Sequence, residues 1–390
     1  MSKNPRLGVW FAAAAMIFFT RALLFSTWQS RGPEVLEALH LDTTQMGLLV
    51  MLFPAGGLLG ILFANSLNNR FGSGKLTIFG FSLGALSLYL LGFTVSAGNV
   101  WLSGLCLIGM GLPMAIADFA GNLQGTEVNN RSSKSLFPAI HAAFGVGMML
   151  AAAFSSYLIE QKIGLELNYL VVAIVVAAGS IWAGLVFPDH VKTEVSKAEK
   201  LETSRLARKV WTEKRTLTIA LIGFSFIMAE ISAGTWLPIA LENSGFSGAA
   251  AASAFGWFWV AITVTRAVGG FVVDRIGRSG SIMLSAIVTG LGISVFVFDS
   301  LIHMPYLGIA LWGMGLALGF PMSVNSMSDE PKAAASRINM IITVVYISSI
   351  LVGPVIGTIG QVFSIYAAFG VPLALMVISA ILSPATKEKV

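Results

Sequence analysis

Charged residues are scarce in this sequence. Only 11% of its 390 residues are Asp, Glu, Lys or Arg, whereas a soluble domain carries about 25%. Hydrophobic residues make up 56%, and the chain contains repeated apolar runs of roughly 20 residues, the length of a membrane-spanning helix. This composition excludes an ordinary soluble domain and predicts an all-α membrane protein with many spans.

Motifs for catalysis are also missing. The four His residues form no ligand-like cluster, and the sequence has no Walker motif. The single cysteine, Cys106, lies in an apolar run and can form no intrachain disulfide. We therefore expect no enzyme, no ATP-driven pump within this chain, and no cofactor or metal.

What the sequence does contain is an internal repeat. The segment Gly270–Arg278 (GFVVDRIGR) has the same pattern as Asn65–Lys75 (NSLNNRFGSGK), with an apolar stretch followed by Arg, Gly and a basic residue. Three anchors lie 204 or 205 residues apart: Gly72 and Gly277, Pro33 and Pro238, and Gly109 and Gly313. A duplication of most of the chain follows from this agreement.

The apolar runs and the repeat together predict six spans in each half. The first run is longer than a signal peptide and the repeat requires it, so we expect it to be a span. The expected spans are 8–29, 46–67, 76–95, 101–124, 137–158, 168–187, 216–239, 249–273, 281–298, 306–326, 338–359 and 365–382. These give an N-terminal six-helix bundle (1–187), a polar linker (188–215) that we interpret mainly as a solvated connector, and a C-terminal bundle (216–390).

The basic residues predict the orientation. Of the 24 Lys and Arg residues, 20 fall in the terminal segments, the linker and the loops on the N-terminal side, and two, Arg31 and Lys162, fall in the opposite loops. By the positive-inside rule, both termini and the linker are cytoplasmic. This location explains the net charge of +5, so we expect no nucleic-acid partner. Six spans per half make the repeats parallel, related by a pseudo-two-fold axis along the membrane normal.

The repeated loop resembles the motif that the major facilitator superfamily carries between its second and third helices and again between its eighth and ninth. Within that superfamily the chain resembles the sugar-permease-like branch that includes rhizopine-transport-type members. The segments that carry this likeness are Trp28–Pro33, Asp118 with Asn122, Ala229–Glu230, Trp236–Pro238 and Gly315–Pro321.

The resemblance implies secondary transport by alternating access, a site lined by the first, fourth, seventh and tenth spans, and a functional monomer. The chain departs from the family pattern at Asn69, where the first loop usually carries Asp. It also lacks the Gly-Pro motif of drug–proton antiporters in the fifth span, which favours import over drug export. We expect the loop residues Arg70, Gly72, Gly270, Asp274, Arg275, Gly277 and Arg278 to act in the conformational switch.

Ionisable residues inside the spans are costly and mark candidate functional positions. Arg21 and Glu230 each lie about 20 Å into equivalent spans, and we expect them to interact directly or through substrate. Glu230 is our candidate for proton coupling, although a salt bridge that only fixes its helix remains open. An Arg near a carboxylate favours ionisation, whereas burial disfavours it.

Asp118 is expected near the cytoplasmic mouth of the fourth span, which makes a direct pair with Arg21 improbable. Asn122 lies one turn further on the same face. The pair belongs to one half only, because the repeat places Met322 and Ser326 at the equivalent positions. We interpret Asp118 and Asn122 as substrate contacts or an inner gate; contact with His141 or with loop amides is the alternative.

Three further positions complete the candidate substrate site. Trp28 and Trp236 precede external prolines and are expected to be belt residues, outer lids or stacking surfaces for a sugar ring, and Asn325 lies in the tenth span. Arg266 is expected either to anchor its helix at the interface or to join Asp274, Arg275 and Arg278 in an inner network.

These observations predict a transporter of the cell inner membrane that imports a small polar solute, sugar- or polyol-like, by proton symport. Efflux of amphipathic compounds is the alternative within transport, and a non-transporting sensor with the same fold is the alternative outside it.

Overall fold

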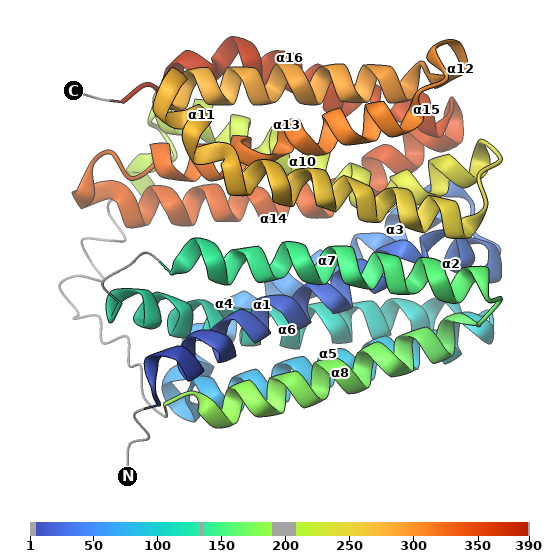
Figure 1. Ribbon diagram of the computed structural model, residues 1–390, viewed down its shortest axis with the longest axis horizontal. Coiled ribbons are helices and arrows are strands. Elements are labelled where there is room, and N and C mark those ends of the chain that lie inside the picture. Colours follow the sequence, from blue (N-terminus) through green and yellow to red (C-terminus); the bar gives the residue numbers. More distant parts are fainter. Residues whose placement is uncertain (1–4, 133–135, 189–207, 389–390) are drawn as a thin grey trace. The chain divides into compact units, whose positions relative to one another are not determined.

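The computed structural model describes residues 5–132, 136–188 and 208–388 (Figure 1). Within these residues it is all-α, as the composition predicted. The helices are α1 (Leu7–Ser30), α2 (Gly32–Ala38), α3 (Thr43–Val50), α4 (Leu52–Phe71), α5 (Ser73–Ser96), α6 (Val100–Asn130), α7 (Phe137–Glu160), α8 (Leu165–Val186), α10 (Lys214–Asn243), α11 (Gly248–Val297), α12 (Asp299–Ile302), α13 (Pro305–Ser326), α14 (Pro331–Val362), α15 (Ile365–Ala368) and α16 (Gly370–Leu382), followed by a 3-10 turn, η1 (Ser383–Thr386).

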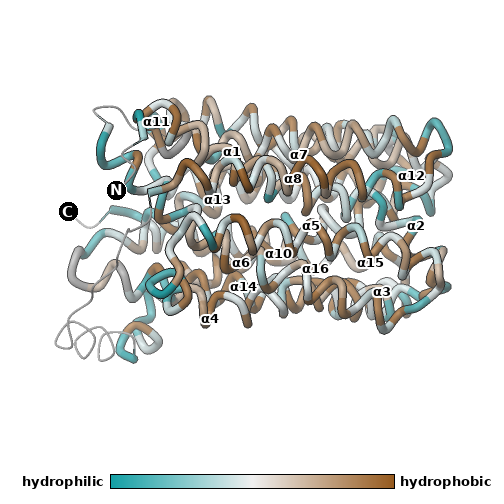
Figure 2. The backbone as a smooth tube through the Cα atoms, turned by 90° about the horizontal axis from the view of Figure 1, so that it is seen from below, coloured by the Kyte–Doolittle hydropathy of each residue, from teal (hydrophilic) through white to brown (hydrophobic). Residues whose placement is uncertain are grey.

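Eleven helical segments of the described chain are long and apolar enough to cross a membrane. The count differs from twelve because α11 contains both the eighth and the ninth expected spans, which meet at Gly277. Gly277 has φ 69°, a backbone conformation that only glycine adopts without strain. The helices are hydrophobic along most of their length, and hydrophilic residues gather at their ends (Figure 2).

By their contacts, the described residues form two compact units. Unit 1 contains 1–193 together with 235–256, and unit 2 contains 194–234 together with 257–390. We call the helix ends beside Arg70 and Arg275 the basic ends of the units, and the other ends the opposite ends. The six-helix bundles expected at 1–187 and 216–390 were defined by the sequence repeat and not by contacts. These units do not test them, so they stay a prediction.

Close backbone contacts at glycines hold unit 1 together. In unit 1, α6 packs against α4 and α5, and α1 packs against α7 and α8. A Cβ added at Gly60 would lie 2.2 Å from the carbonyl oxygen of Leu112, and one added at Gly80 would lie 2.4 Å from that of Pro113. These approaches exclude side chains, so the glycines set the helix spacing.

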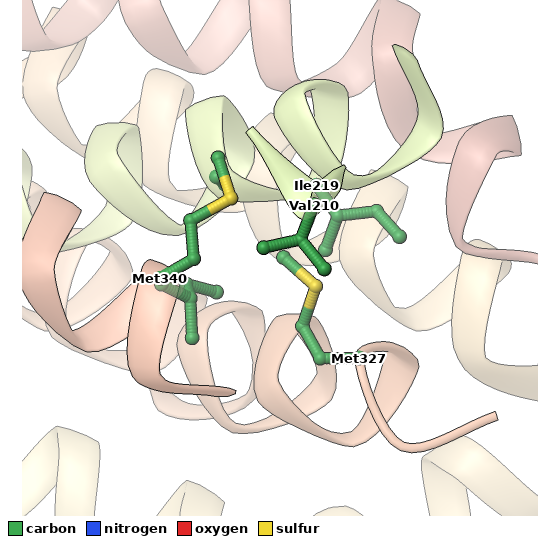
Figure 3. Packing of buried hydrophobic residues seen from close by; sticks show 6 residues of the cluster. Val210, Ile219, Met327 and Met340 are labelled. Carbon is green, nitrogen blue, oxygen red and sulfur yellow. The ribbon is translucent and has the colours of Figure 1, made fainter. Parts of the chain in front are cut away.

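Unit 2 repeats this construction with α13 against the second part of α11. A Cβ at Gly315 would lie 2.3 Å from the amide nitrogen of Thr289. At the basic end, Val210, Ile219, Met327 and Met340 pack in one buried cluster (Figure 3). Val210 lies in the last part of the expected linker (188–215), of which 189–207 falls outside the described residues, so the end of the linker is part of the core.

Candidate substrate and coupling site

An ion pair lies inside the spans of unit 1. Nη1 of Arg21 on α1 donates to both carboxylate oxygens of Asp118 on α6, each at 3.0 Å. The side chains are 36% and 22% exposed, so the pair is reachable by a solute. Because removing a charged group from water costs several kcal/mol unless it is paired, each residue stabilises the other at this depth.

The sequence-based interpretation of Asp118 was wrong on this point, since it placed the residue too near the cytoplasmic mouth to reach Arg21. The cause is the length of α6, which continues to Asn130 instead of ending at Gln124. Asp118 therefore lies about 18 Å from the basic end of its helix and Arg21 about 21 Å from that of α1, at 1.5 Å per residue. The remaining difference is within the reach of an arginine side chain.

Three further side chains surround this pair. The guanidinium carbon of Arg21 lies 5.3 Å from the ring centroid of Phe144 on α7, a cation–π contact. The His141 ring, one turn earlier on α7, lies 4.4 Å from the ring of Phe18. Asn122 donates from Nδ2 to the backbone carbonyl of Asp118 at 2.9 Å, so its amide faces back along α6.

The two tryptophans of the candidate site are both buried in unit 1. Trp28 is 3% exposed and Trp236 is 0% exposed, and the part of the chain that the structure describes offers no acceptor for Nε1 of Trp236. Trp236 precedes Ile239, which together with the backbone of Thr235 faces Gly32 at the α1–α2 corner. Their proposed contact with a solute stays a prediction.

The remaining candidate residues of the interior lie in unit 2. Glu230 on α10 is half-buried, and it belongs to a different unit from Arg21. The interaction predicted between them, and the role of Glu230 in proton coupling, therefore stay predictions. Asn325 lies at the basic end of α13, where its Oδ1 accepts from Nη1 of Arg278 at 2.9 Å.

The two copies of the repeated loop share their backbone turn. Gly72 has φ 83° and Gly277 has φ 69°, and both end one helix and begin the next. The arginines before them each lie over a neighbouring phenylalanine, Arg70 over Phe71 at 5.2 Å and Arg275 over Phe271 at 4.6 Å. Gly270 and Asp274 are exposed.

Arg278 makes the densest ionic contact at the basic end of unit 2. Its guanidinium meets Asp329 as a two-nitrogen fork, Nη1 to Oδ1 at 2.9 Å and Nη2 to Oδ2 at 3.0 Å. Nη2 of Arg215 on α10 reaches the same carboxylate at 2.6 Å. Burial raises the pKa of Asp329, but the hydrogen bonds from the two arginines outweigh it and hold the pKa below its usual range.

Both arginines also bind the chain after α16. Nε of Arg278 donates to the carbonyl of Thr386 at 2.8 Å, and Nε of Arg215 donates to that of Ala385 at 2.9 Å. Arg266 instead donates to the carbonyl of Ala317 at 3.2 Å. Arg278 therefore has partners other than the predicted Arg266, Asp274 and Arg275, whose joint network stays a prediction, and the sequence reasoning missed Asp329 and Arg215. The sequence does show both residues as charges next to the ends of two expected spans.

A buried arginine was also missed at the opposite end of unit 1. Arg31, expected in a loop, is 1% exposed. It donates to Oε1 of Glu34 at 2.5 Å, to Oδ1 of Asn168 at 3.0 Å and to the carbonyl of Ile163 at 3.0 Å. It thereby joins the α1–α2 corner to α8. Burial raises the pKa of Glu34 although Arg31 lowers it.

The described residues contain no group of three or more His, Cys, Asp or Glu side chains arranged to hold a metal ion. The contacts that the interior side chains of unit 1 make are ionic and hydrogen-bonding. Apolar spans that hold ionic groups within them are typical of membrane transporters.

The comparisons with known proteins give the family. The model of the Major Facilitator Superfamily matches residues 10–354, so the chain belongs to this superfamily of transporters, which are not enzymes. It is 23% identical over 368 residues to an uncharacterised MFS-type transporter of Yersinia pestis, covering 94% of this chain and 93% of the relative. It is 22% identical over 391 residues to the membrane protein MosC of Rhizobium meliloti, covering 97% and 89%.

Solved structures of the superfamily have the same fold. A variant of the nucleoside transporter NupG superposes with a TM-score of 0.78 at 15% identity, covering 97% of this chain and 98% of the other. The fucose:proton symporter FucP of E. coli superposes with a TM-score of 0.65 at 17% identity, covering 97% and 98%. The predicted fold class and the predicted superfamily are confirmed.

Proposed function

We propose that this transporter moves a small polar solute, sugar- or polyol-like, by alternating access and together with protons. The observation that supports this proposal most directly is the partly exposed pair of Arg21 and Asp118. An apolar or amphipathic cargo needs no charged pair at this depth, whereas a polar solute exchanges hydrogen bonds with water for hydrogen bonds with such groups.

We further propose that the protein lies in the inner membrane with both termini in the cytoplasm. The charge asymmetry supports this orientation, because 20 of the 24 Lys and Arg residues fall on one side of the expected topology. Symport is supported by the presence of ionisable groups in the interior and by the likeness in fold to a fucose:proton symporter.

Uptake into proteoliposomes under an imposed pH gradient tests the proposal. With sugars and polyols offered outside and the lumen alkaline, we expect accumulation that collapses when a protonophore is added. Extrusion driven by the reversed gradient would favour efflux, and the absence of any flux across the panel would favour a sensor.

One variant and a matched control test whether Glu230 couples transport to protons. Glu230→Gln is expected to lose accumulation driven by the pH gradient and to keep counterflow exchange, because the amide cannot carry a proton between the two sides. Glu160→Gln is the matched control, since Glu160 is exposed at the end of α7. Accumulation that survives in Glu230→Gln would show that this residue does not couple transport to protons.

A further inference from the structure

Arg21 binds Asp118 with one nitrogen only. Nη1 donates to both carboxylate oxygens, although an arginine and a carboxylate usually meet as a fork of two parallel bonds from two nitrogens. Arg278 and Asp329 make that fork in unit 2. Within the described residues, Nε and Nη2 of Arg21 have no acceptor, so one edge of the guanidinium is unused.

This unused edge has the geometry that a carboxylate requires. Nε and Nη2 point the same way in a rigid plane and match the spacing of two carboxylate oxygens. The Arg21 side chain is 36% exposed, which leaves the edge accessible. Phe144 contacts the guanidinium and restricts its rotation, so a ligand meets a donor pair that is already oriented.

The charge in the interior decides what else must accompany such a ligand. Arg21 and Asp118 together are neutral, and an added carboxylate leaves one uncompensated negative charge at a depth where that is costly. A proton on Asp118 restores neutrality, and the ligand then takes over as the counter-ion of Arg21. A neutral polyol creates no such imbalance and needs no proton here.

The charged and titratable groups around Asp118 are few. On α1 the group is Arg21, and α7, which packs against α1, carries His141 near Phe18. The helices α4 and α5, which pack against α6, carry charges only near their basic ends, at Arg70 and Lys75. Asp118 is thus the carboxylate of unit 1 at this depth within the described residues.

We propose that the transported solute carries a carboxylate that binds the Nε and Nη2 edge of Arg21, and that one proton travels with it on Asp118. A sugar acid or a hydroxylated carboxylic acid fits this site. The proposal rests on the proposed function, because it assumes that Arg21 and Asp118 contact the solute. In this proposal the transported proton is carried by Asp118 instead of Glu230. It enters Asp118 from one side and leaves to the other, so the cycle moves one anion and one proton without net charge.

To test whether the site recognises a carboxylate, we would measure how the purified protein binds pairs of compounds that differ in the acid group. We would compare D-gluconate with D-glucitol, D-glucuronate with D-glucose, and L-lactate with propane-1,2-diol by thermal shift and by titration. The acid of at least one pair is expected to bind about tenfold or more tightly than its neutral partner. If each neutral compound binds as well as its acid, or no acid binds, the carboxylate assignment is wrong.

Variants place the ligand on Arg21. Arg21→Lys keeps the charge but removes the fork, and is expected to lower the affinity for the acid about tenfold or more. Arg6→Lys, at an exposed position near the start of α1, is the control and should bind like the wild type. Asp118→Asn keeps the neutral state of the carboxyl, so its affinity for the acid should no longer fall as pH rises.

Transport measurements test the proton and separate this proposal from the general one. In proteoliposomes, uptake of the acid should follow the pH gradient and be unaffected by a potassium diffusion potential, and Asp118→Asn should exchange the acid without accumulating it. Accumulation of neutral polyols without the acids would refute this inference and leave the proposed function intact. The absence of flux for every compound would refute both.

Discussion

The first half pairs two ionic groups within its spans at positions where the second half carries apolar residues. In the first half, Arg21 and Asp118 pair within the spans. The positions 205 and 204 residues further along are Phe226 and Met322. Phe226 is buried, and its ring lies where a Cβ at Gly319 would be, 2.1 Å from Cε1. The equivalent helices therefore meet through an ion pair in the first half and through a phenylalanine packed on a glycine in the second.

The basic ends show the reverse. In the second half, Arg215 and Arg278 converge on Asp329. The position equivalent to Arg215 is Trp10, which is buried and donates from Nε1 to Oε1 of Gln124 at 2.8 Å. The position equivalent to Arg278 is Ser73, which bonds Asn68.

The two halves therefore share the packing of their helices but differ in the side chains that they carry at equivalent positions. We interpret the first half as the one that carries the solute site in unit 1, and the second as the one that fixes its basic end with ion pairs. The following variants exchange or remove these features.

The largest effect is expected from making the first half resemble the second. Arg21→Leu leaves Asp118 unpaired in the interior, at a cost of about 2.5–3.5 kcal/mol on insertion scales. Transport should fall by about 100-fold or more, because the proposed contact of Arg21 with the solute is lost. The double variant Arg21→Leu with Asp118→Leu should recover thermal stability and still not transport. Transport by the double variant would contradict a role of the pair in the solute site.

Removing the ion pair between Arg278 and Asp329 is expected to lower the stability of the protein. Arg278→Ala breaks a largely buried pair in which the side chains are 5% and 11% exposed, and should destabilise the protein by about 3 kcal/mol. The equivalent change Ser73→Ala removes one hydrogen bond and should cost about 1 kcal/mol. Thermal unfolding in detergent measures both, and equal losses would mean that the two basic ends are held equally strongly.

Gly111 and Gly315, which are equivalent, are expected to behave alike. A Cβ would lie 2.1 Å from the carbonyl oxygen of Phe53 in the first case and 2.3 Å from the amide nitrogen of Thr289 in the second. Each alanine variant should cost about 1–3 kcal/mol, since backbone must move. Gly270→Ala is the control, because no described atom beyond its chain neighbours and the backbone of its own helix lies within 4 Å of its added Cβ. A loss at Gly270 comparable to the other two would contradict this steric explanation.

Two carboxylates are expected to respond oppositely to pH. The pKa of Asp329 is lowered by its arginines despite burial, so its contribution to stability is present above the unfolded pKa of about 3.9 and is lost as pH falls through the folded pKa. The pKa of Glu34 is raised by burial, so its contribution is present below about 4.3 and is lost as pH rises through the folded pKa.

The measurement is thermal stability between pH 3 and pH 7. Asp329→Asn should be less stable than wild type at pH 7, and the difference should shrink below about pH 4. Glu34→Gln should match or exceed wild type at pH 7. A Glu34→Gln protein that is clearly less stable at pH 7 would mean that the bond to Arg31 outweighs the cost of burying the charge.

The smallest effect is expected at the basic end of unit 1. Trp10→Phe keeps an aromatic ring and loses the hydrogen bond to Gln124, which should cost about 1 kcal/mol. Transport should be retained, because Trp10 lies at the end of α1 remote from Arg21 in sequence. Thermal unfolding and uptake check the two parts of this expectation, and a loss of transport without a loss of stability would assign Trp10 a role in the transport cycle.

Most of the fold was predictable because hydrophobicity over long runs and a repeated loop are local signals. The first span, expected at 8–29, is α1 at Leu7–Ser30, and the tenth, expected at 306–326, is α13 at Pro305–Ser326. The end of α6 was missed because its last turns are polar and carry no hydrophobic signal. That error of six residues moved Asp118 in depth and concealed its bond to Arg21.

The candidate site was predictable as a set of residue types but not as a set of pairs. Arg21 and Asp118 were identified because charges inside spans are rare, but their bond to each other was not expected. Asp329 and Arg31 were not identified, since a charge next to a span end is the common case and sequence does not show which of these is buried.

The amino-acid sequence alone determined that this chain crosses the membrane many times, that its halves are copies, and which residues are charged within the spans. These properties depend on composition and spacing along the chain. The tertiary structure decided which charge meets which, because a pairing requires two side chains from helices almost 100 residues apart to reach the same depth. That depth depends on where each helix ends and how closely its glycines let it approach its neighbours.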